Sequence, residues 1–84
     1  MNTAGSWRNC PFTPGRKYLV LKDFVAHRDR FVAGECLNFS HDAYSIYDSC
    51  TGYFFQLELG QMKVWDLYDD EMLESWRELF RETR

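Results

Sequence analysis

The sequence predicts a mainly β fold, a small barrel of about five antiparallel strands with an amphipathic helix at the C-terminal end. Its 84 residues are enough for one domain but not for two separate cores. Aromatic residues make up 18% of the chain, and such rings bury enough area to form a core without a metal or a disulfide. Apolar and polar residues alternate in several short runs up to residue 67, whereas a helical period begins at residue 69.

Residues 1–16 contain both prolines and two of the five glycines, which predicts an irregular or flexible N-terminal arm. Trp7 and Phe12 are unusual in such an arm, so we expect part of it to fold back onto the body of the protein. The turn at Pro14-Gly15 is expected to mark the start of regular structure. Residues 17–84 then form a single domain.

The first part of the domain predicts two strands. Residues 17–25 are rich in β-formers and mostly apolar on both faces, as in a central strand. Residues 26–30 are charged and predict a loop, and an apolar return at 31–33 ends at Gly34. Residues 35–40 alternate again, which predicts the second strand.

Three more strands are expected before the helix, at 44–47, 53–59 and 62–67. A break at 41–43 precedes the first of them, and a turn at 48–52, with Asp at one end and Gly at the other, separates the first from the second.

The helix is predicted over about residues 69–82. Asp69 and Asp70 stand where an N-cap and a first-turn acid stabilise free N–H groups. We expect the helix to pack across the barrel and to cover aromatic residues on its outer face. Its apolar face consists of five bulky side chains at helical spacing, Met72, Leu73, Trp76, Leu79 and Phe80.

The formal net charge is −3 and the pI is about 5.2, which argues against a purely electrostatic nucleic-acid binder. Residues 1–40 hold six basic and three acidic residues, whereas residues 41–84 hold four basic and ten acidic ones. A solvated helix face accounts for most of the acidic residues, because they lie on the predicted helix and just before it.

The three cysteines are Cys10, Cys36 and Cys50, an odd number without a C-x-x-C pair. This pattern favours small, semi-buried side chains in a reducing compartment, so we expect a cytoplasmic protein. Cys50 lies in a predicted turn and is the cysteine expected to be exposed. No apolar run resembles a signal-peptide core or approaches the roughly 18 residues of a membrane span, so no membrane partner is expected.

Two segments carry a resemblance to a known fold. Residues 18–26 (YLVLKDFVA), a charged loop and residues 31–39 (FVAGECLNF) resemble the front of an SH3 domain, with its Asp-Phe-x-Ala strand end and its Gly-Glu-x-Leu. The resemblance implies an SH3-like barrel. The Trp pair and the Pro-Ser-x-Tyr that build the SH3 groove for proline-rich peptides have no counterparts in this sequence, so recognition of such peptides is not implied.

The chain as a whole resembles a family of small bacterial domains without an assigned activity. The shared pattern is Tyr-x-Val-x-x-Asp-Phe, then Gly-Glu, then a Phe-rich strand that leads into a Trp-containing tail. This resemblance also implies an SH3-like barrel, and it implies no functional residue.

The most polar cluster is His27, Arg28, Asp29 and Arg30, which would flank the ligand groove of an SH3-like barrel and could contact a charged peptide. The alternative is a solvated hairpin loop whose ion pairs contribute little. Tyr44, Tyr47 and Trp65 are the aromatic candidates for surface anchors. The alternative for these rings is burial under the C-terminal helix.

Metal, cofactor and catalytic sites are not expected. His27 and His41 lack a third ligand at metal-binding spacing. Each has an Asp nearby that could orient a general base, but no Ser or Cys carries a nucleophile signature, and a small barrel has little room for a substrate.

The sequence therefore favours a non-catalytic module that binds an unidentified protein or peptide through residues 26–33 and neighbouring aromatic rings. One alternative is a single-stranded nucleic-acid-binding barrel, in which bases stack on aromatic side chains. Another is a small enzyme that uses a loop histidine. Self-association through a strand edge is compatible with each of these functions.

Overall fold

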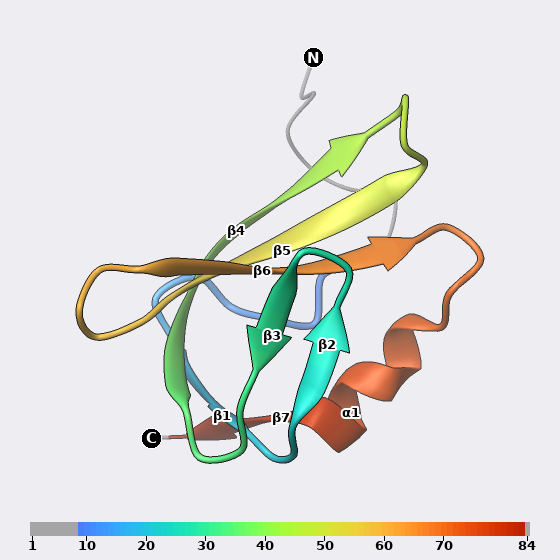
Figure 1. The fold of residues 1–84 in the computed structure, drawn as a ribbon. Coiled ribbons are helices and arrows are strands. Elements are labelled where there is room, and N and C mark those ends of the chain that lie inside the picture. The colour runs from blue at the N-terminus through green and yellow to red at the C-terminus, as the bar shows by residue number, and fades with distance from the viewer. Residues whose placement is uncertain (1–8, 84) are drawn as a thin grey trace.

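The computed structural model describes residues 9–83, which form a mainly β fold, as predicted (Figure 1). The strands are β1 (Lys17–Val20), β2 (Phe24–Ala26), β3 (Asp29–Phe31), β4 (Cys36–Ser45), β5 (Cys50–Gln56), β6 (Met62–Tyr68) and β7 (Phe80–Thr83). Five of them form one antiparallel sheet in the order β6-β5-β4-β1-β7, and β2 pairs with β3. The barrel is not closed, because β6 and β7 lie at opposite ends of the large sheet.

The predicted loop at 26–30 is a hairpin. Strands β2 and β3 pair around a two-residue turn, His27-Arg28, and His27 adopts a left-handed backbone with φ of 56°. Tight turns of this kind match the twist of the strands they join. The prediction of one continuous strand over 17–25 is wrong, because the chain leaves the large sheet after Val20 to form this hairpin.

The predicted break at 41–43 is also wrong, because β4 runs through it. Its register with β5 shifts between Phe39 and His41, which marks a β-bulge. An extra residue at a bulge bends the strand and reverses which face the following side chains occupy. Phe39 therefore points into the core, whereas His41 stacks on Phe54 outside it.

The C-terminal helix is much shorter than the predicted range of 69–82. A 3₁₀ turn, η1 (Leu73–Ser75), and α1 (Trp76–Leu79) are followed at once by β7. Met72 takes the N-cap position, so the prediction that Asp69 and Asp70 cap the helix is wrong. The reason is tertiary: pairing with β1 satisfies the backbone of residues 80–83 and buries Phe80, which outweighs local helical preference.

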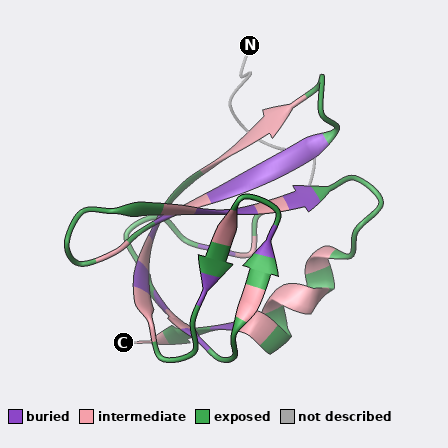
Figure 2. Ribbon diagram, viewed as in Figure 1, coloured by how far each residue is buried: buried purple, intermediate pink, exposed green. Residues whose placement is uncertain are grey.

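Aromatic side chains of the large sheet, the hairpin and α1 pack together in the core. Figure 2 marks the buried residues along the strands in purple. Phe12 is 3% exposed, and its ring lies within 6.1 Å, centroid to centroid, of seven other aromatic rings. The prediction that part of the N-terminal arm folds back is therefore confirmed at Phe12, whereas Trp7 lies outside the described residues. Between residues 9 and 83 no helix has the length and apolar character needed to cross a bilayer.

Candidate functional site

A shallow hollow lies on the side of β4, β5 and β6 that faces away from the aromatic core. Facing residues on the three strands form three rows across the sheet, read from the strand registers. The rows are His41-Phe54-Val64, Ala43-Gly52-Asp66 and Ser45-Cys50-Tyr68. Large rings occupy one corner of this face and small side chains its centre, so the middle of the face is depressed.

Gly52 makes this depression, because it stands in the centre of the middle row. A Cβ atom at Gly52 would lie 3.1 Å from Cγ1 of Val64, 3.2 Å from Cε1 of Phe54 and 3.3 Å from Oδ1 of Asp66. The glycine thus lets these side chains close in over the strand. Its neighbour Ala43 keeps the β4 side of the floor low.

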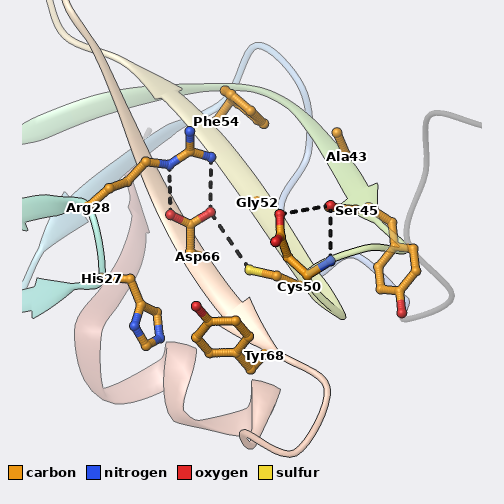
Figure 3. Close-up of a pocket in the computed structure, with 11 residues that line it drawn as sticks. His27, Arg28, Ala43, Ser45, Cys50, Gly52, Phe54, Asp66 and Tyr68 are labelled. Carbon is orange, nitrogen blue, oxygen red and sulfur yellow. Dashed lines mark hydrogen bonds and ion pairs between the residues drawn. The ribbon is translucent and has the colours of Figure 1, made fainter.

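The hollow is a pocket of about 520 Å³ (Figure 3). The turn of the β2–β3 hairpin forms one wall with His27 and Arg28, and Tyr68 stands beside it. Tyr44 and Asp48, at the far end of β4 and in the turn after it, complete the rim. Segments distant in the sequence thus meet around one floor.

Arg28 and Asp66 form the principal ion pair of the pocket. Nε of Arg28 donates to Oδ2 of Asp66 at 2.7 Å, and Nη2 donates to Oδ1 at 3.0 Å. The Asp66 side chain is only 11% exposed, against 56% for Arg28. The hydrogen bond to Asp66 raises the pKa of Arg28, and its guanidinium lies 5.6 Å from the centre of the Phe54 ring. A guanidinium is therefore held between a carboxylate and an aromatic ring.

Cys50 lies on the floor, in strand β5, and is buried. The prediction of an exposed cysteine in a turn over 48–52 is wrong, because the turn occupies residues 46–49. The Cys50 thiol donates to Oδ1 of Asp66 at 3.9 Å, and burial together with the Asp66 charge raises its pKa. Since the thiolate is the nucleophilic form, the raised pKa keeps this sulfur unreactive near neutral pH.

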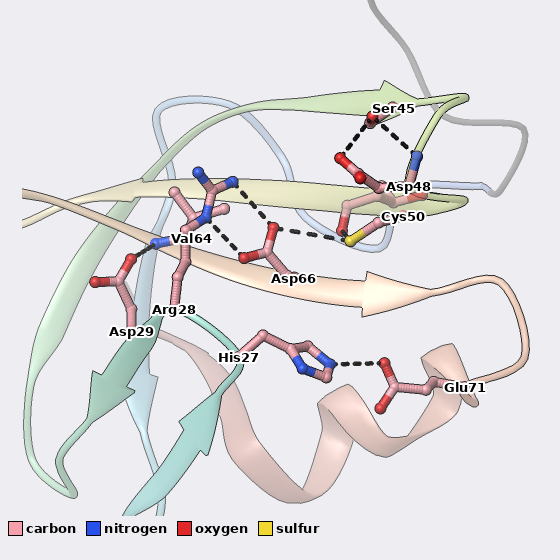
Figure 4. Close-up of polar contacts among 10 residues, drawn as sticks. His27, Arg28, Asp29, Ser45, Asp48, Cys50, Val64, Asp66 and Glu71 are labelled. Carbon is pink, nitrogen blue, oxygen red and sulfur yellow. Dashed lines mark hydrogen bonds and ion pairs between the residues drawn. The ribbon is translucent and has the colours of Figure 1, made fainter.

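Contacts of His27 and Asp29 fix the hairpin to the rest of the site (Figure 4). Nε2 of His27 lies 3.1 Å from Oε1 of Glu71, and the His27 ring packs edge-on against Tyr68 with centroids 4.5 Å apart. On the other strand of the hairpin, Oδ2 of Asp29 accepts a hydrogen bond of 2.8 Å from the backbone N–H of Val64. The β2–β3 hairpin, which forms one wall of the pocket, is therefore held against β6 and the segment before η1.

Tyr44 contributes to the rim through its hydroxyl, which donates to Oδ2 of Asp69 at 2.8 Å. This hydrogen bond raises the pKa of Tyr44, so the phenol remains a neutral donor. In the turn after β4, the Ser45 hydroxyl donates to Oδ2 of Asp48 at 3.0 Å. Both hydroxyls thereby orient carboxylates at the edge of the pocket.

The seven residues singled out in the sequence divide between several places. His27, Arg28 and Tyr44 line the pocket. Asp29 binds the β6 backbone instead, and the exposed Arg30 offers its carbonyl oxygen to Lys63. The remaining two are aromatic, and they differ: Tyr47 is 96% exposed on the turn beyond the pocket, whereas Trp65 is 4% exposed. Trp65 as a surface anchor is therefore wrong, because alternation along β6 places its ring, with Leu67, on the core side of the sheet.

Sequence reasoning missed the floor of the pocket. The sequence predicts a turn at Cys50 and Gly52, and its patterns indicate no role for Asp66 or Tyr68. One pattern in the sequence does indicate this floor. Small residues occupy every second position, Ala43 and Ser45 on one strand and Cys50 and Gly52 on the next. Among residues 9–83, no three His, Cys, Asp or Glu side chains are grouped as a metal ion would require.

A second pocket of about 700 Å³ adjoins the first. It lies between β2 and the η1–α1 segment, and its rim includes Val25, which is 71% exposed, and Met72, which is 69% exposed. His27 and Asp66 line both pockets, so the two form neighbouring parts of one surface. Asp70 and Glu71 line this second pocket but not the first.

The comparisons with known proteins concern the fold. The sequence matches no protein-family profile and no curated protein. Among solved structures, it is similar to an integron cassette protein from the mobile metagenome of Vibrio cholerae. The two structures superpose with a TM-score of 0.72 at 19% sequence identity, over 87% of each chain. The similarity shows that a bacterial cassette protein has the same fold.

Proposed function

We propose that this chain is a non-catalytic module that binds a protein or peptide in the pocket on β4, β5 and β6. The observation that carries the proposal is the pocket itself, a hollow of about 520 Å³ with aromatic walls and a fixed ion pair. Ligand sites typically combine mostly apolar walls with a few oriented polar groups, at volumes of roughly 300–1,000 Å³. This hollow accommodates one or two side chains of a partner.

The state of the polar groups favours binding over catalysis. The Cys50 thiol is held neutral, and the Ser45 hydroxyl donates to Asp48, an arrangement that lacks an adjacent histidine base. His27 is engaged with Glu71, and its ring packs against Tyr68. These groups hold one another in place, which suits recognition by a preorganised surface.

We also infer that the fold is a variant of the SH3-like barrel. The resemblance of residues 18–39 to the front of an SH3 domain supports this, and so does the charged β2–β3 hairpin beside the pocket. The cysteines among residues 9–83 are free, in agreement with a reducing compartment, so we place the protein in the cytoplasm.

The test fills the pocket from its floor. Ala43→Phe introduces a ring beside Gly52, whereas Ala33→Phe introduces the same ring at an exposed position in the turn before β4. Peptides are selected from a random displayed library on the wild-type chain, and each selected peptide is titrated against both variants. We expect Ala43→Phe to weaken binding at least about tenfold and Ala33→Phe to leave it unchanged.

Equal binding to the wild type and both variants would overturn the proposal. The same titrations are run with single-stranded oligonucleotides. If these bind more tightly than any selected peptide, with an affinity that falls as salt rises, the protein is a nucleic-acid binder instead.

A further inference from the structure

We propose that the side chain which enters the pocket is cationic, an Arg or Lys from a basic segment of the partner, an inference that rests on the proposed function. The first support is the charge around the site. Asp48 and Asp66 line the first pocket, Asp70 and Glu71 line its neighbour, and Asp69 is held at the rim by Tyr44. Among the described residues, Arg28 is the one Lys or Arg that lines either pocket, and Nε2 of His27 lies 3.1 Å from Oε1 of Glu71.

The Arg28–Asp66 ion pair does not cancel the excess of negative charge around the pockets. Arg28 is committed to Asp66 through two hydrogen bonds, so its charge is matched within the pair. Asp48 accepts a hydrogen bond from the Ser45 hydroxyl, which carries no charge to offset that of the carboxylate. Burial is the main cause that raises the pKa of the Cys50 thiol; the charges of Asp66 and Asp48 raise it further, and the charge of Arg28 lowers it. Both carboxylates therefore act at the floor of the pocket.

The protein itself provides a template for the bound state. The guanidinium of Arg28 lies over Phe54 while it donates to a carboxylate. Tyr44 and Asp48 also line the pocket, so a partner meets an aromatic residue and a carboxylate there as well. A guanidinium or ammonium group binds well between an aromatic ring and a carboxylate, and the apolar stem of Arg or Lys can pack along the ring edges. An acidic peptide would meet like charge at the same place.

The experiment compares peptides that differ only in charge. A short glycine peptide carries one central arginine, and its analogues carry citrulline, which has the same shape without the charge, or glutamate. Each is titrated into the ¹⁵N-labelled full chain, and amide shifts are followed by NMR. We expect the arginine peptide to shift the amides of Tyr44, Asp48, Gly52 and Asp66, and to bind about tenfold more tightly than the citrulline peptide.

A matched pair of variants separates the pocket from the general acidity of the protein. Asp48→Asn keeps the acceptor for Ser45 and removes one charge at the rim, whereas Glu58→Gln removes one charge from the exposed turn between β5 and β6. We expect Asp48→Asn to weaken binding of the arginine peptide about threefold and Glu58→Gln to change it less than about 1.5-fold.

Equal affinities for the arginine and citrulline peptides, or equal losses in the two variants, would overturn the cationic partner. A different result would contradict the proposed function itself. If the cationic partner is overturned but Ala43→Phe still weakens the binding of library-selected peptides, the pocket binds peptides of another chemistry. If none is sensitive to Ala43→Phe, the pocket is not a binding site.

Discussion

Asp66 organises the candidate site at the scale of single residues. Its carboxylate is largely buried and accepts hydrogen bonds from Arg28 and from the thiol of Cys50. A buried carboxylate is stable only when donors and positive charge compensate its lost hydration. The ion pair therefore has a structural role as well as a place in the pocket, and the two roles can be separated by mutation.

Arg28→Met is expected to lower the free energy of unfolding by about 1–3 kcal/mol, because it leaves the Asp66 carboxylate without its counter-charge. Urea unfolding followed by tryptophan fluorescence measures the loss. The double variant Arg28→Met/Asp66→Asn should recover part of it, since no buried charge remains. Arg30→Met, at an exposed position nearby, is the control and should change stability by less than about 0.5 kcal/mol. A single Arg28→Met variant as stable as the wild type would show that Asp66 is solvated.

The Cys50 thiol adds a pH dependence whose sign follows from its raised pKa. Below the ordinary thiol value of 9.0, both the folded and the unfolded state hold the proton. Above it the unfolded chain ionises first, so the folded state binds more protons and the free energy of unfolding falls as pH rises. Urea unfolding of the wild type and of Cys50→Ala, on both sides of this pH, should show a smaller fall in the variant. An identical fall in both would contradict the assignment, and Cys36→Ala provides the control for loss of a thiol elsewhere.

The element whose structure departs most from local preference is β7. Residues 80–83 continue a helical sequence pattern, yet they pair with β1 along the edge of the large sheet. The backbone N–H of Leu21 donates to the carbonyl of Leu79, and paired residues in antiparallel strands bond alternately. Arg81 therefore bonds to β1 through its backbone, whereas the N–H of Glu82 faces away from the sheet.

Proline substitutions at these two positions should have unequal effects. Arg81→Pro removes a donor to β1 and should lower the free energy of unfolding by about 2–3 kcal/mol. Glu82→Pro removes an outward N–H and an exposed ion pair with Arg16, and should lower it by about 1 kcal/mol or less. Chemical denaturation of the two variants tests the register. Equal losses, or a larger loss for Glu82→Pro, would mean that β7 does not pair with β1 as described.

The same edge bears on self-association, which stays a prediction. Strand β7 has no neighbour on its outer side among the described strands, and open edges can pair with a second chain. If such pairing occurs, Glu82→Pro should abolish it, because the outward N–H is lost. Sedimentation velocity of the wild type and of this variant over a range of concentrations measures the effect. A dimer that persists unchanged in Glu82→Pro would exclude this edge.

At the scale of the whole molecule, Phe12 links the N-terminal segment to the large sheet and to α1. Its ring contacts residues of β1, β4, β5, β6, α1 and β7. Small domains rely on such residues, because their cores supply only a few kcal/mol of net stability.

Phe12→Ala is expected to lower the free energy of unfolding by about 3–5 kcal/mol, the usual loss for a buried Phe, and so to leave the domain close to unfolded. Thermal unfolding followed by circular dichroism measures the change. Phe12→Leu should retain most of the stability, and Pro14→Ala, at an exposed position, should have little effect. A loss below about 1 kcal/mol for Phe12→Ala would contradict its central place in the core.

Local sequence patterns were enough to predict the mainly β class and the positions of several strands. The alternation in 53–59 and 62–67 reports burial on one face, which is a local property of a strand. Residues 53–56 and 62–67 lie in β5 and β6, whereas 57–59, the predicted end of the first of these strands, lead into a turn. The charged segment at 26–30 was also visible, and two of its residues, His27 and Arg28, reach the candidate site.

Only the tertiary structure decided the ends of the chain and the floor of the pocket. Residues 80–83 pair with β1 and do not extend the helix. Phe12 is buried by rings that are distant in the sequence. The pocket required a bulge in β4, a glycine in β5 and the Arg28–Asp66 contact, whose residues are 38 positions apart. These features depend on strand register and on long-range packing, and the spacing of apolar residues along the chain encodes neither of them.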